Sequence, residues 1–311
     1  MEVKKYKKWE NLHTTADGKD RGKVSFKKLE TLWFNTGTLC NLSCDNCYIE
    51  SSPTNDRLVY LTLQDIKLYT QEIRDNNWSL KSIGITGGEP FLNPHIIKIL
   101  RECLSLNIPT LLLTNAHKVI KRWEKDLLAL KKEFGDLLRL RVSLDHYTKE
   151  AHESERGKDT FRATLKSMKW LYDNDFHISI AGRSLFQEKE EIAREGYQNL
   201  LNDNDINLKL STDSLVIFPE MNATEDIPEI TIDCWSILNV SPSDQMCATE
   251  RMIVKRKNES KPKVLSCTLI AYNKEFELGE TLQESFKDIH LNHPYCSKFC
   301  VLGGASCSST N

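Results

Sequence analysis

The sequence predicts an α/β fold: a partial (β/α)6 barrel of the TIM type, followed by a small cysteine-rich extension. Two observations lead to this prediction. From residue 31 to about residue 222, short apolar segments alternate with longer amphipathic ones, a pattern typical of parallel strands joined by crossover helices. Beyond that point the chain is rich in Pro, Ser, Asn and Cys. In such a barrel, closed or partial, the reactive residues belong at the carboxyl ends of the strands.

Six segments of the barrel region are predicted to be strands. They are residues 32–35, 82–86, 110–114, 138–144, 177–181 and 215–218.

Helices are predicted between most of these strands. Thr62 and Asp65 match a variant capping box at the start of one helix, and Asn93 with Pro94 suits the N-cap and first turn of the next. Asp159 precedes an apolar stripe at helical spacing, which we interpret as core. The stripe consists of Phe161, Leu165, Met168 and Leu171.

The chain is divided into three parts by its patterning. Residues 1–30 are polar and are expected to form an arm or short hairpin packed on the main body. Residues 31–222 form the barrel, and residues 223–311 form the extension, which contains a hairpin-like passage at residues 252–256 and 264–267.

Composition excludes several functional classes. The formal net charge is -2, from 42 basic and 44 acidic residues, so no overall attraction to nucleic acid or to an anionic membrane is expected. The basic start of the chain leads into polar sequence without an apolar signal region, and no run of about eighteen apolar residues follows. We expect a cytoplasmic protein. Its ten cysteines then favour metal or redox chemistry over disulfides.

Three cysteines follow the first predicted strand directly. Cys40, Cys44 and Cys47 have the spacing C-x-x-x-C-x-x-C, which lets three thiolates converge on one metal centre. A structural zinc site normally takes four ligands and paired C-x-x-C units. Three thiolates on a 4Fe-4S cluster instead leave one iron without a protein ligand, and that iron can bind a small molecule.

This spacing at the end of a first strand resembles the radical S-adenosylmethionine (SAM) superfamily. The resemblance covers about residues 31 to 220 and implies a 4Fe-4S cluster whose open iron is chelated by the amino and carboxylate groups of SAM. It also implies that one-electron reduction releases methionine and a 5'-deoxyadenosyl radical, which abstracts a hydrogen atom from a substrate. A flavodoxin or ferredoxin is the expected electron donor.

A second motif follows the second predicted strand. Gly87 and Gly88 allow a ligand to approach the backbone closely, and the carboxylate of Glu89 can accept hydrogen bonds from an ammonium group. The alternative, a tight turn between strand and helix, explains the glycines but not the glutamate. The motif matches the glycine-rich motif of the resembled family, which holds the amino group of SAM.

Further strand ends agree with the resemblance. Thr114 and Asn115 follow the third strand, and Ser143 and Asp145 follow the fourth; in the family these positions contact the ribose and carboxylate of SAM. Ala116 stands where the family often has glycine.

Two later positions complete the implied cofactor site. Arg183 follows the fifth strand, where it could bind the SAM carboxylate through its planar fork or form an exposed ion pair. Phe218 lies in the sixth strand, where the backbone of the family binds adenine.

The last quarter of the chain holds a second group of cysteines. The ligand set expected there is Cys247, Cys267, Cys296 and Cys300, with Cys307 competing for the last place. The group is similar to the auxiliary-cluster extensions of the superfamily known as SPASM and twitch domains, and it implies a second 4Fe-4S cluster. Zinc is the alternative occupant, because tetrahedral thiolate sites serve either metal.

These features predict a radical SAM enzyme of the oxidoreductase type. Oxidation of a small molecule is the leading hypothesis, because residues 1–30 are too short for a separate peptide-recognition module. Two alternatives are a peptide-modifying radical SAM enzyme and a non-catalytic zinc-binding protein. The last would leave Gly87, Gly88 and Glu89 without a ligand.

Overall fold

The computed structural model describes residues 7–186, 188–219 and 226–304. Its centre is a nine-stranded sheet with the strand order β10-β9-β8-β2-β3-β4-β5-β6-β7. The six strands from β2 to β7 pair in parallel, and they confirm all six predicted strands within two residues at each end. These strands are β2 (Thr31–Asn35), β3 (Ser82–Thr86), β4 (Thr110–Thr114), β5 (Leu138–Ser143), β6 (His177–Arg183) and β7 (Leu215–Phe218).

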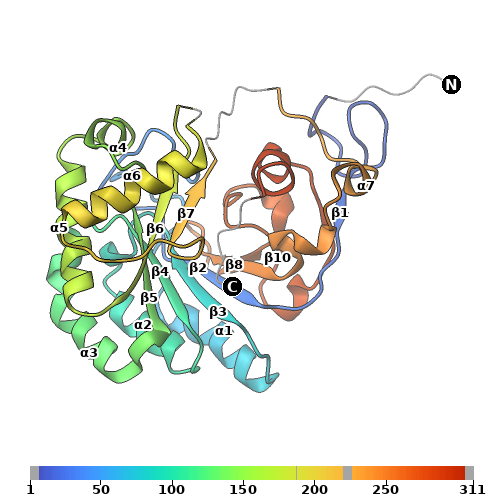
Figure 1. Cartoon of the computed structure of the whole chain (residues 1–311). Helices are drawn as coiled ribbons and strands as arrows, with labels where there is room; N and C mark the ends of the chain where they lie inside the picture. Colours follow the sequence, from blue (N-terminus) through green and yellow to red (C-terminus); the bar gives the residue numbers. More distant parts are fainter. Residues whose placement is uncertain (1–6, 187, 220–225, 305–311) are drawn as a thin grey trace.

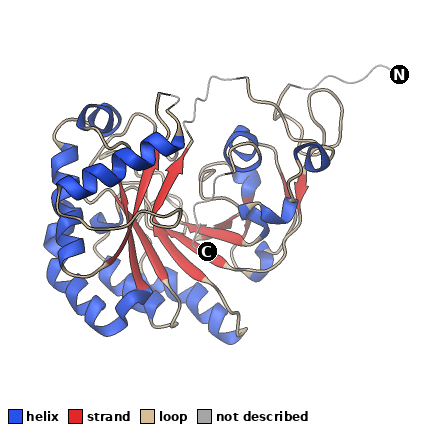
Figure 2. Cartoon of the chain, in the orientation of Figure 1, coloured by secondary structure: helices blue, strands red, loops and turns tan. Residues whose placement is uncertain are grey.

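Six α-helices connect the barrel strands in the described part of the chain; five of them cover the outer face of the sheet, and α4 lies at the strand ends (Figures 1 and 2). No helix in the described part of the chain is long and apolar enough to cross a membrane. The α-helices are α1 (Leu63–Asp75), α2 (Ile96–Leu104), α3 (Glu124–Phe134), α4 (Lys149–Arg156), α5 (Thr160–Asp173), α6 (Glu190–Asp203) and, in the extension, α7 (Cys234–Leu238). The short helices are η1 (Pro90–Leu92), η2 (Val119–Trp123), η3 (Gly135–Leu137), η4 (Pro242–Asp244), η5 (Met246–Ala248), η6 (Lys274–Phe276), η7 (Gln283–Ser285) and η8 (Cys296–Val301).

The predicted helix starts are partly confirmed. Thr62 caps α1 in a complete capping box, in which its hydroxyl accepts from the N–H of Asp65 and the Asp65 carboxylate accepts from the N–H of Thr62. The prediction for α2 is wrong, because this helix begins at Ile96 with His95 as its N-cap. The buried side chain of Asn93 instead closes the preceding turn by accepting from the N–H of His95 at 2.8 Å.

The main core lies between the sheet and its helices. The apolar stripe of α5, which directly follows Asp159, is buried there as predicted. The buried members of this stripe are Phe161, Leu165, Met168 and Leu171. This core fills the outer side of the sheet. The side chains at the carboxyl ends of the strands lie outside it, where the functional site of such a barrel is expected.

The extension continues the barrel sheet. β8 (Glu250–Val254) pairs in parallel with β2, on the side opposite β3. β9 (Lys263–Leu265) pairs antiparallel with β8 and confirms the predicted hairpin, and β10 (Glu277–Gly279) follows β9 at the edge. The predicted domain boundary at residues 222–223 lies outside the described residues.

Residues 7–24 of the N-terminal arm pack on the extension, while Leu29 and Glu30 at its end contact the barrel. β1 (Lys23–Val24) pairs antiparallel with β11 (Ile289–His290), and the N–H of Gly22 donates to the carbonyl oxygen of Ile230 at 2.7 Å. The bridge between Thr14 and Asp20 makes the expected short hairpin. The arm therefore belongs structurally with the C-terminal part of the chain, beside α7 (Figure 1).

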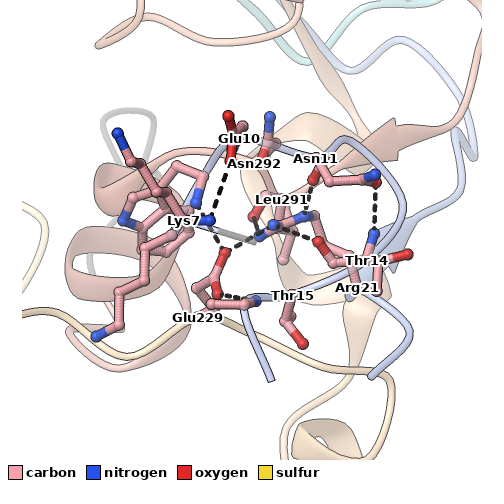
Figure 3. A network of polar contacts seen from close by, with 12 residues as sticks. Lys7, Glu10, Asn11, Thr14, Thr15, Arg21, Glu229, Leu291 and Asn292 are labelled. Carbon is pink, nitrogen blue, oxygen red and sulfur yellow. Dashed lines mark hydrogen bonds and ion pairs between the residues drawn. The ribbon is translucent and has the colours of Figure 1, made fainter. Parts of the chain in front are cut away.

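A buried ion pair fixes this arm (Figure 3). Nη2 of Arg21 lies 2.7 Å from Oε1 of Glu229, and both side chains are almost completely buried. Arg21 also donates to the carbonyl oxygens of Asn11 and Thr14, while Glu229 accepts from the N–H of Trp9. The pair is thus surrounded by hydrogen bonds, which a buried ion pair needs to offset its desolvation.

Candidate functional site

A cavity of about 200 Å³ lies at the carboxyl ends of the barrel strands. Its walls come from β2 to β7, from the cysteine loop after β2 and from three residues of the extension, Thr268, Leu269 and Phe299. Almost all residues predicted for the barrel site line it. They are Cys40, Cys44, Cys47, Gly87, Gly88, Thr114, Asn115, Ser143, Asp145, Arg183 and Phe218. The exception is Glu89.

The three cysteines present their sulfurs to this cavity. Sγ of Cys40 accepts a hydrogen bond from the N–H of Leu42, and Sγ of Cys47 accepts one from the N–H of Ser51. Burial raises the pKa of the Cys40 thiol to about 12, so binding to a metal centre is what makes it a thiolate. The described residues contain no group of three or more His, Cys, Asp or Glu side chains that could hold a metal ion. A cubane cluster spreads its thiolates over separate irons and needs a wider arrangement.

The two glycines seat their motif against the cysteine loop. The N–H of Gly88 donates to the carbonyl oxygen of Gly37 at 2.7 Å, and the N–H of Glu89 donates to that of Leu39 at 3.1 Å. A Cβ at position 88 would stand 2.2 Å from the backbone oxygen of Leu39. Glycine is therefore required for the close approach of the two loops that border the cavity.

The carboxylate of Glu89 is turned into the protein. It accepts hydrogen bonds from the N–H groups of Phe91 and Asn115 and from the hydroxyl of Thr114, at 2.8 to 3.0 Å. The residue is 1 % exposed. Burial raises the pKa of Glu89 to about 7, although these hydrogen bonds act in the opposite direction.

Asn115 and Thr114 are also engaged within the chain. The Asn115 amide donates to Oδ1 of Asn41 at 2.9 Å and to Sγ of Cys40 at 3.6 Å. The next residue, Ala116, has φ of +53°, a left-handed conformation that explains why glycine suits this position.

A cluster of charge lies beside Cys44. Asp145 is 2 % exposed, and Nε of Arg156 lies 2.8 Å from its Oδ2 while Nε of Arg183 lies 3.5 Å from its Oδ1. Burial alone would raise the pKa of Asp145, but the two guanidinium groups outweigh it and the pKa is lowered. The passage His152 to Phe161, with Arg156 and Gly157, resembles the segment that follows the fourth strand in the family, but Arg156 was not among the predicted site residues.

Three buried donors in the cavity wall indicate a polar ligand. Nδ2 of Asn35, Oγ of Ser51 and Nη1 of Arg183 have no hydrogen-bond partner within the described chain. Unpaired buried donors are costly, so groups of this kind mark a place where a ligand is bound. The carboxylate and ribose of SAM are acceptors of the required kind, and the donor set fits this cofactor.

The cavity wall on the extension side is aromatic. Phe299 stacks on Phe218 with ring centroids 5.7 Å apart, and it meets Tyr48 edge to face at 6.0 Å. Sequence reasoning missed Phe299, although its position between Cys296 and Cys300 was a usable signal. The extension therefore adds an apolar surface to one side of the site.

The C-terminal cysteines line a second, smaller cavity. Its volume is about 20 Å³, and its lining includes Cys247, Cys267, Cys296 and Cys300. Burial raises the pKa of the thiols of the first three. Cys307 lies outside the described residues. The four cysteines of the preferred set thus meet at one place, an arrangement compatible with a second cluster.

Known proteins are similar in sequence to part of this chain. The antilisterial bacteriocin subtilosin biosynthesis protein AlbA of Bacillus subtilis is 32% identical over 150 residues, which are 48% of this chain and 32% of AlbA. A probable GTP 3',8-cyclase of Saccharolobus islandicus is 26% identical over 147 residues, 47% of this chain and 45% of the cyclase. The chain therefore spans less than half the length of either relative that it matches.

Solved structures share the fold. Streptococcus suis SuiB bound to SAM superposes with a TM-score of 0.56 at 16% identity, over 81% of this chain and 63% of SuiB. SuiB bound to its precursor peptide SuiA gives a TM-score of 0.57 at 15% identity, over 89% and 66%. At these identities the likeness concerns the fold alone, and it confirms the predicted α/β partial barrel.

The profile of the radical SAM superfamily matches residues 34–196, from the first barrel strand into α6. This segment contains the cysteine loop, the glycine motif and the charge cluster. Because the match covers more than half of the chain, the protein belongs to the radical SAM superfamily, whose enzymes use a 4Fe-4S cluster and SAM.

Proposed function

We propose that this radical SAM enzyme modifies a peptide. The observation that carries the proposal is the 32% identity to AlbA, a protein of bacteriocin biosynthesis. The shared fold with SuiB, which has been solved with its precursor peptide SuiA, supports it. This proposal replaces small-molecule oxidation as the leading hypothesis.

Parts of the reaction are proposed for particular residues of the cavity. Cys40, Cys44 and Cys47 are proposed to hold the 4Fe-4S cluster, and Arg183 with Ser143 to hold SAM at the strand ends. When bound and reduced by a flavodoxin or ferredoxin, this pair of cofactors supplies a 5'-deoxyadenosyl radical. The chain itself orients SAM and keeps water from the reacting carbon.

The extension contributes a wall and a second metal site in this proposal. Phe299 and Leu269 border the cavity from the extension side and are proposed to contact the substrate. Cys247, Cys267 and Cys296 are proposed to hold an auxiliary cluster, with Cys300 or Cys307 as the fourth ligand. A fully ligated cluster there suits electron transfer, which an oxidation of the substrate requires.

Small-molecule chemistry is retained as the second candidate. The 26% identity to a probable GTP 3',8-cyclase favours it over part of the barrel. The two candidates differ in which compound gives up the hydrogen atom.

Hydrogen transfer tests the proposal. The protein is reconstituted anaerobically with iron and sulfide and incubated with SAM, reductant and deuterated peptides encoded beside its gene. We expect deuterium in the 5'-deoxyadenosine, measured by mass spectrometry. Deuterium transfer from labelled GTP but from no peptide would contradict peptide modification. Absence of any 5'-deoxyadenosine from cluster-loaded, reduced protein would contradict the assigned cofactor residues as well.

A further inference from the structure

Two backbone groups and one side chain donate hydrogen bonds to the sulfurs of the barrel cysteines, within the part of the chain that the structure describes. The backbone donors are the N–H of Leu42, to Cys40, and the N–H of Ser51, to Cys47. The side chain is that of Asn115, whose Nδ2 lies 3.6 Å from Sγ of Cys40. Because a side-chain donor can be removed by substitution, its contribution can be measured.

We propose that Asn115 and Glu89 are positioning residues of the radical cluster. Asn115 donates an N–H···S hydrogen bond to the Cys40 thiolate, and Glu89 fixes the loop that presents this donor. Hydrogen bonds to the sulfurs are one of the factors that set the reduction potential of an iron-sulfur cluster. A donor stabilises the reduced cluster more than the oxidised one, because reduction adds negative charge. Asn115 therefore makes the cluster easier to reduce.

The amide of Asn115 can take only one orientation. Its Oδ1 accepts from the N–H of His117 at 2.8 Å, so Nδ2 must be the group that faces Cys40. Nδ2 also donates to Oδ1 of Asn41 at 2.9 Å, and the amide nitrogen of Asn41 donates in turn to the carbonyl oxygen of His117. Asn115 is 5 % exposed. The donor is thus held rigidly against the sulfur.

Glu89 holds the backbone of this donor. Its Oε2 accepts from the N–H of Asn115 at 2.8 Å, and its two oxygens share the hydroxyl of Thr114 at 2.9 and 3.0 Å. Oε1 also accepts from the N–H of Phe91. The carboxylate does not border the cavity. Glu89 therefore joins the end of β3 to the end of β4 and acts on the cluster through Asn115.

The midpoint potential of the SAM-free cluster tests this assignment, measured by redox titration followed by EPR in the cluster-loaded protein. The signal of the barrel cluster is identified by its change when SAM is added. We expect Asn115→Leu to shift the potential to a more negative value, with iron content unchanged. Asn115→Ala serves as a second variant with less steric demand and should shift it in the same direction.

Thr164→Val is the matched control. The Thr164 hydroxyl donates to the carbonyl oxygen of Asn115 at 3.1 Å, so this variant disturbs the same loop but leaves the donor to Cys40. Its potential should equal that of the wild type. An unchanged potential in both Asn115 variants, or an equal shift in Thr164→Val, overturns the proposed hydrogen bond.

Glu89→Gln separates positioning from direct binding of SAM. Glutamine at position 89 places an NH2 group opposite the N–H of Asn115, so Asn115 should move away from its position in the wild type. The midpoint potential should therefore shift in the same direction as in Asn115→Leu, but by a smaller amount. The double variant with Asn115→Leu should show no further shift. Glu89→Gln is also expected to weaken SAM binding, measured by calorimetry, because the motif of the family holds the SAM amino group. A SAM-free potential that stays unchanged in Glu89→Gln overturns the positioning role given to Glu89.

Discussion

The two cysteine groups of the chain differ in how the fold assembles them. The barrel group comes from one loop, Cys40 to Cys47, and borders a cavity of about 200 Å³. The extension group combines Cys247 from η5, Cys267 from the turn after β9, and Cys296 with Cys300 from η8, around a cavity of about 20 Å³. One site is open and local in sequence, and the other is closed and assembled from distant segments.

Their surroundings differ as well. Among the described residues, four charged side chains line the barrel cavity, namely Arg141, Arg156, Arg183 and Asp145. No charged side chain in the described chain lines the extension cavity, where aromatic and aliphatic residues surround the thiols. A charged wall suits exchange of a charged cofactor and substrate, whereas an apolar enclosure suits a permanently bound centre. The contrast supports a division between radical generation and electron transfer.

Replacing the barrel cysteines is the strongest test of that division. The variant with Cys40, Cys44 and Cys47 all changed to alanine should lose SAM cleavage completely, because SAM then has no cluster to bind. Iron should remain in the extension, measured by iron counting and Mössbauer spectroscopy. Loss of all iron would contradict a second cluster.

The converse variant provides the control. Cys247→Ser with Cys267→Ser should abolish the iron of the extension but retain reductive cleavage of SAM to 5'-deoxyadenosine in the absence of substrate. If this variant also loses cleavage, the two sites are not separable in function.

The same contrast explains what the sequence could predict. The spacing of Cys40, Cys44 and Cys47 is local, and parallel strands place their carboxyl ends at one edge, so the location of the site followed from strand order. The cofactor roles of the other residues there came from the resemblance to the family. The pairing of Arg156 with Asp145 depends on α4 folding back over the strand ends, which periodicity does not show.

Contacts between distant segments were the main omissions. Phe299 reaches the barrel cavity because η8 lies over the strand ends, and the N-terminal arm reaches the extension because β1 pairs with β11. The three donors of the chain that hold the carboxylate of Glu89 come from the ends of two strands, and the motif alone did not indicate them. Neither effect is encoded in local sequence.

The buried ion pair of the arm tests whether the extension depends on residues 7–24. Arg21→Met should lower the free energy of unfolding by about 3–5 kcal/mol, because it leaves the Glu229 carboxylate buried without its partner. Urea unfolding followed by circular dichroism measures this change. Lys8→Met is the control, because its pair with Asp226 is exposed and should contribute at most about 1 kcal/mol.

Arg156 and Asp145 form the corresponding buried ion pair in the barrel. Arg156→Met should cost less than Arg21→Met, because Arg183 remains 3.5 Å from Asp145. A larger loss in the barrel variant would show that the charge cluster beside Cys44 depends mainly on Arg156.

A buried histidine should make the barrel sensitive to acid. Burial lowers the pKa of His152 to about 4, while its pKa in the unfolded chain is near the ordinary 6.5. The imidazole of His152 is therefore protonated below about pH 6.5 in the unfolded chain but only below about pH 4 in the folded chain. The free energy of unfolding falls as the pH drops through this range. Between pH 7 and pH 5 the loss is about 2 kcal/mol.

His152→Asn tests this dependence. Its Oδ1 can replace Nδ1 of the imidazole as acceptor for the N–H of Asp145, but it does not titrate. Urea unfolding of the cluster-free protein at pH 7 and pH 5 should show a smaller difference in the variant. Burial also lowers the pKa of His293 in the extension to about 4, so His293→Asn should reduce the difference by a similar amount, and an unchanged difference in either variant would contradict this pH dependence.

Helix caps provide the smallest comparison between the two regions. Thr62→Ala removes the capping box of α1, a helix of 13 residues, and should cost about 1 kcal/mol. Ser241 caps only the three-residue η4 of the extension, with its hydroxyl 3.3 Å from the N–H of Ser243. Ser241→Ala should therefore cost less than Thr62→Ala in urea unfolding. An equal loss of unfolding free energy would mean that η4 depends on its cap as strongly as α1 does. Packing around the cysteines would then not be what holds the short helices of the extension.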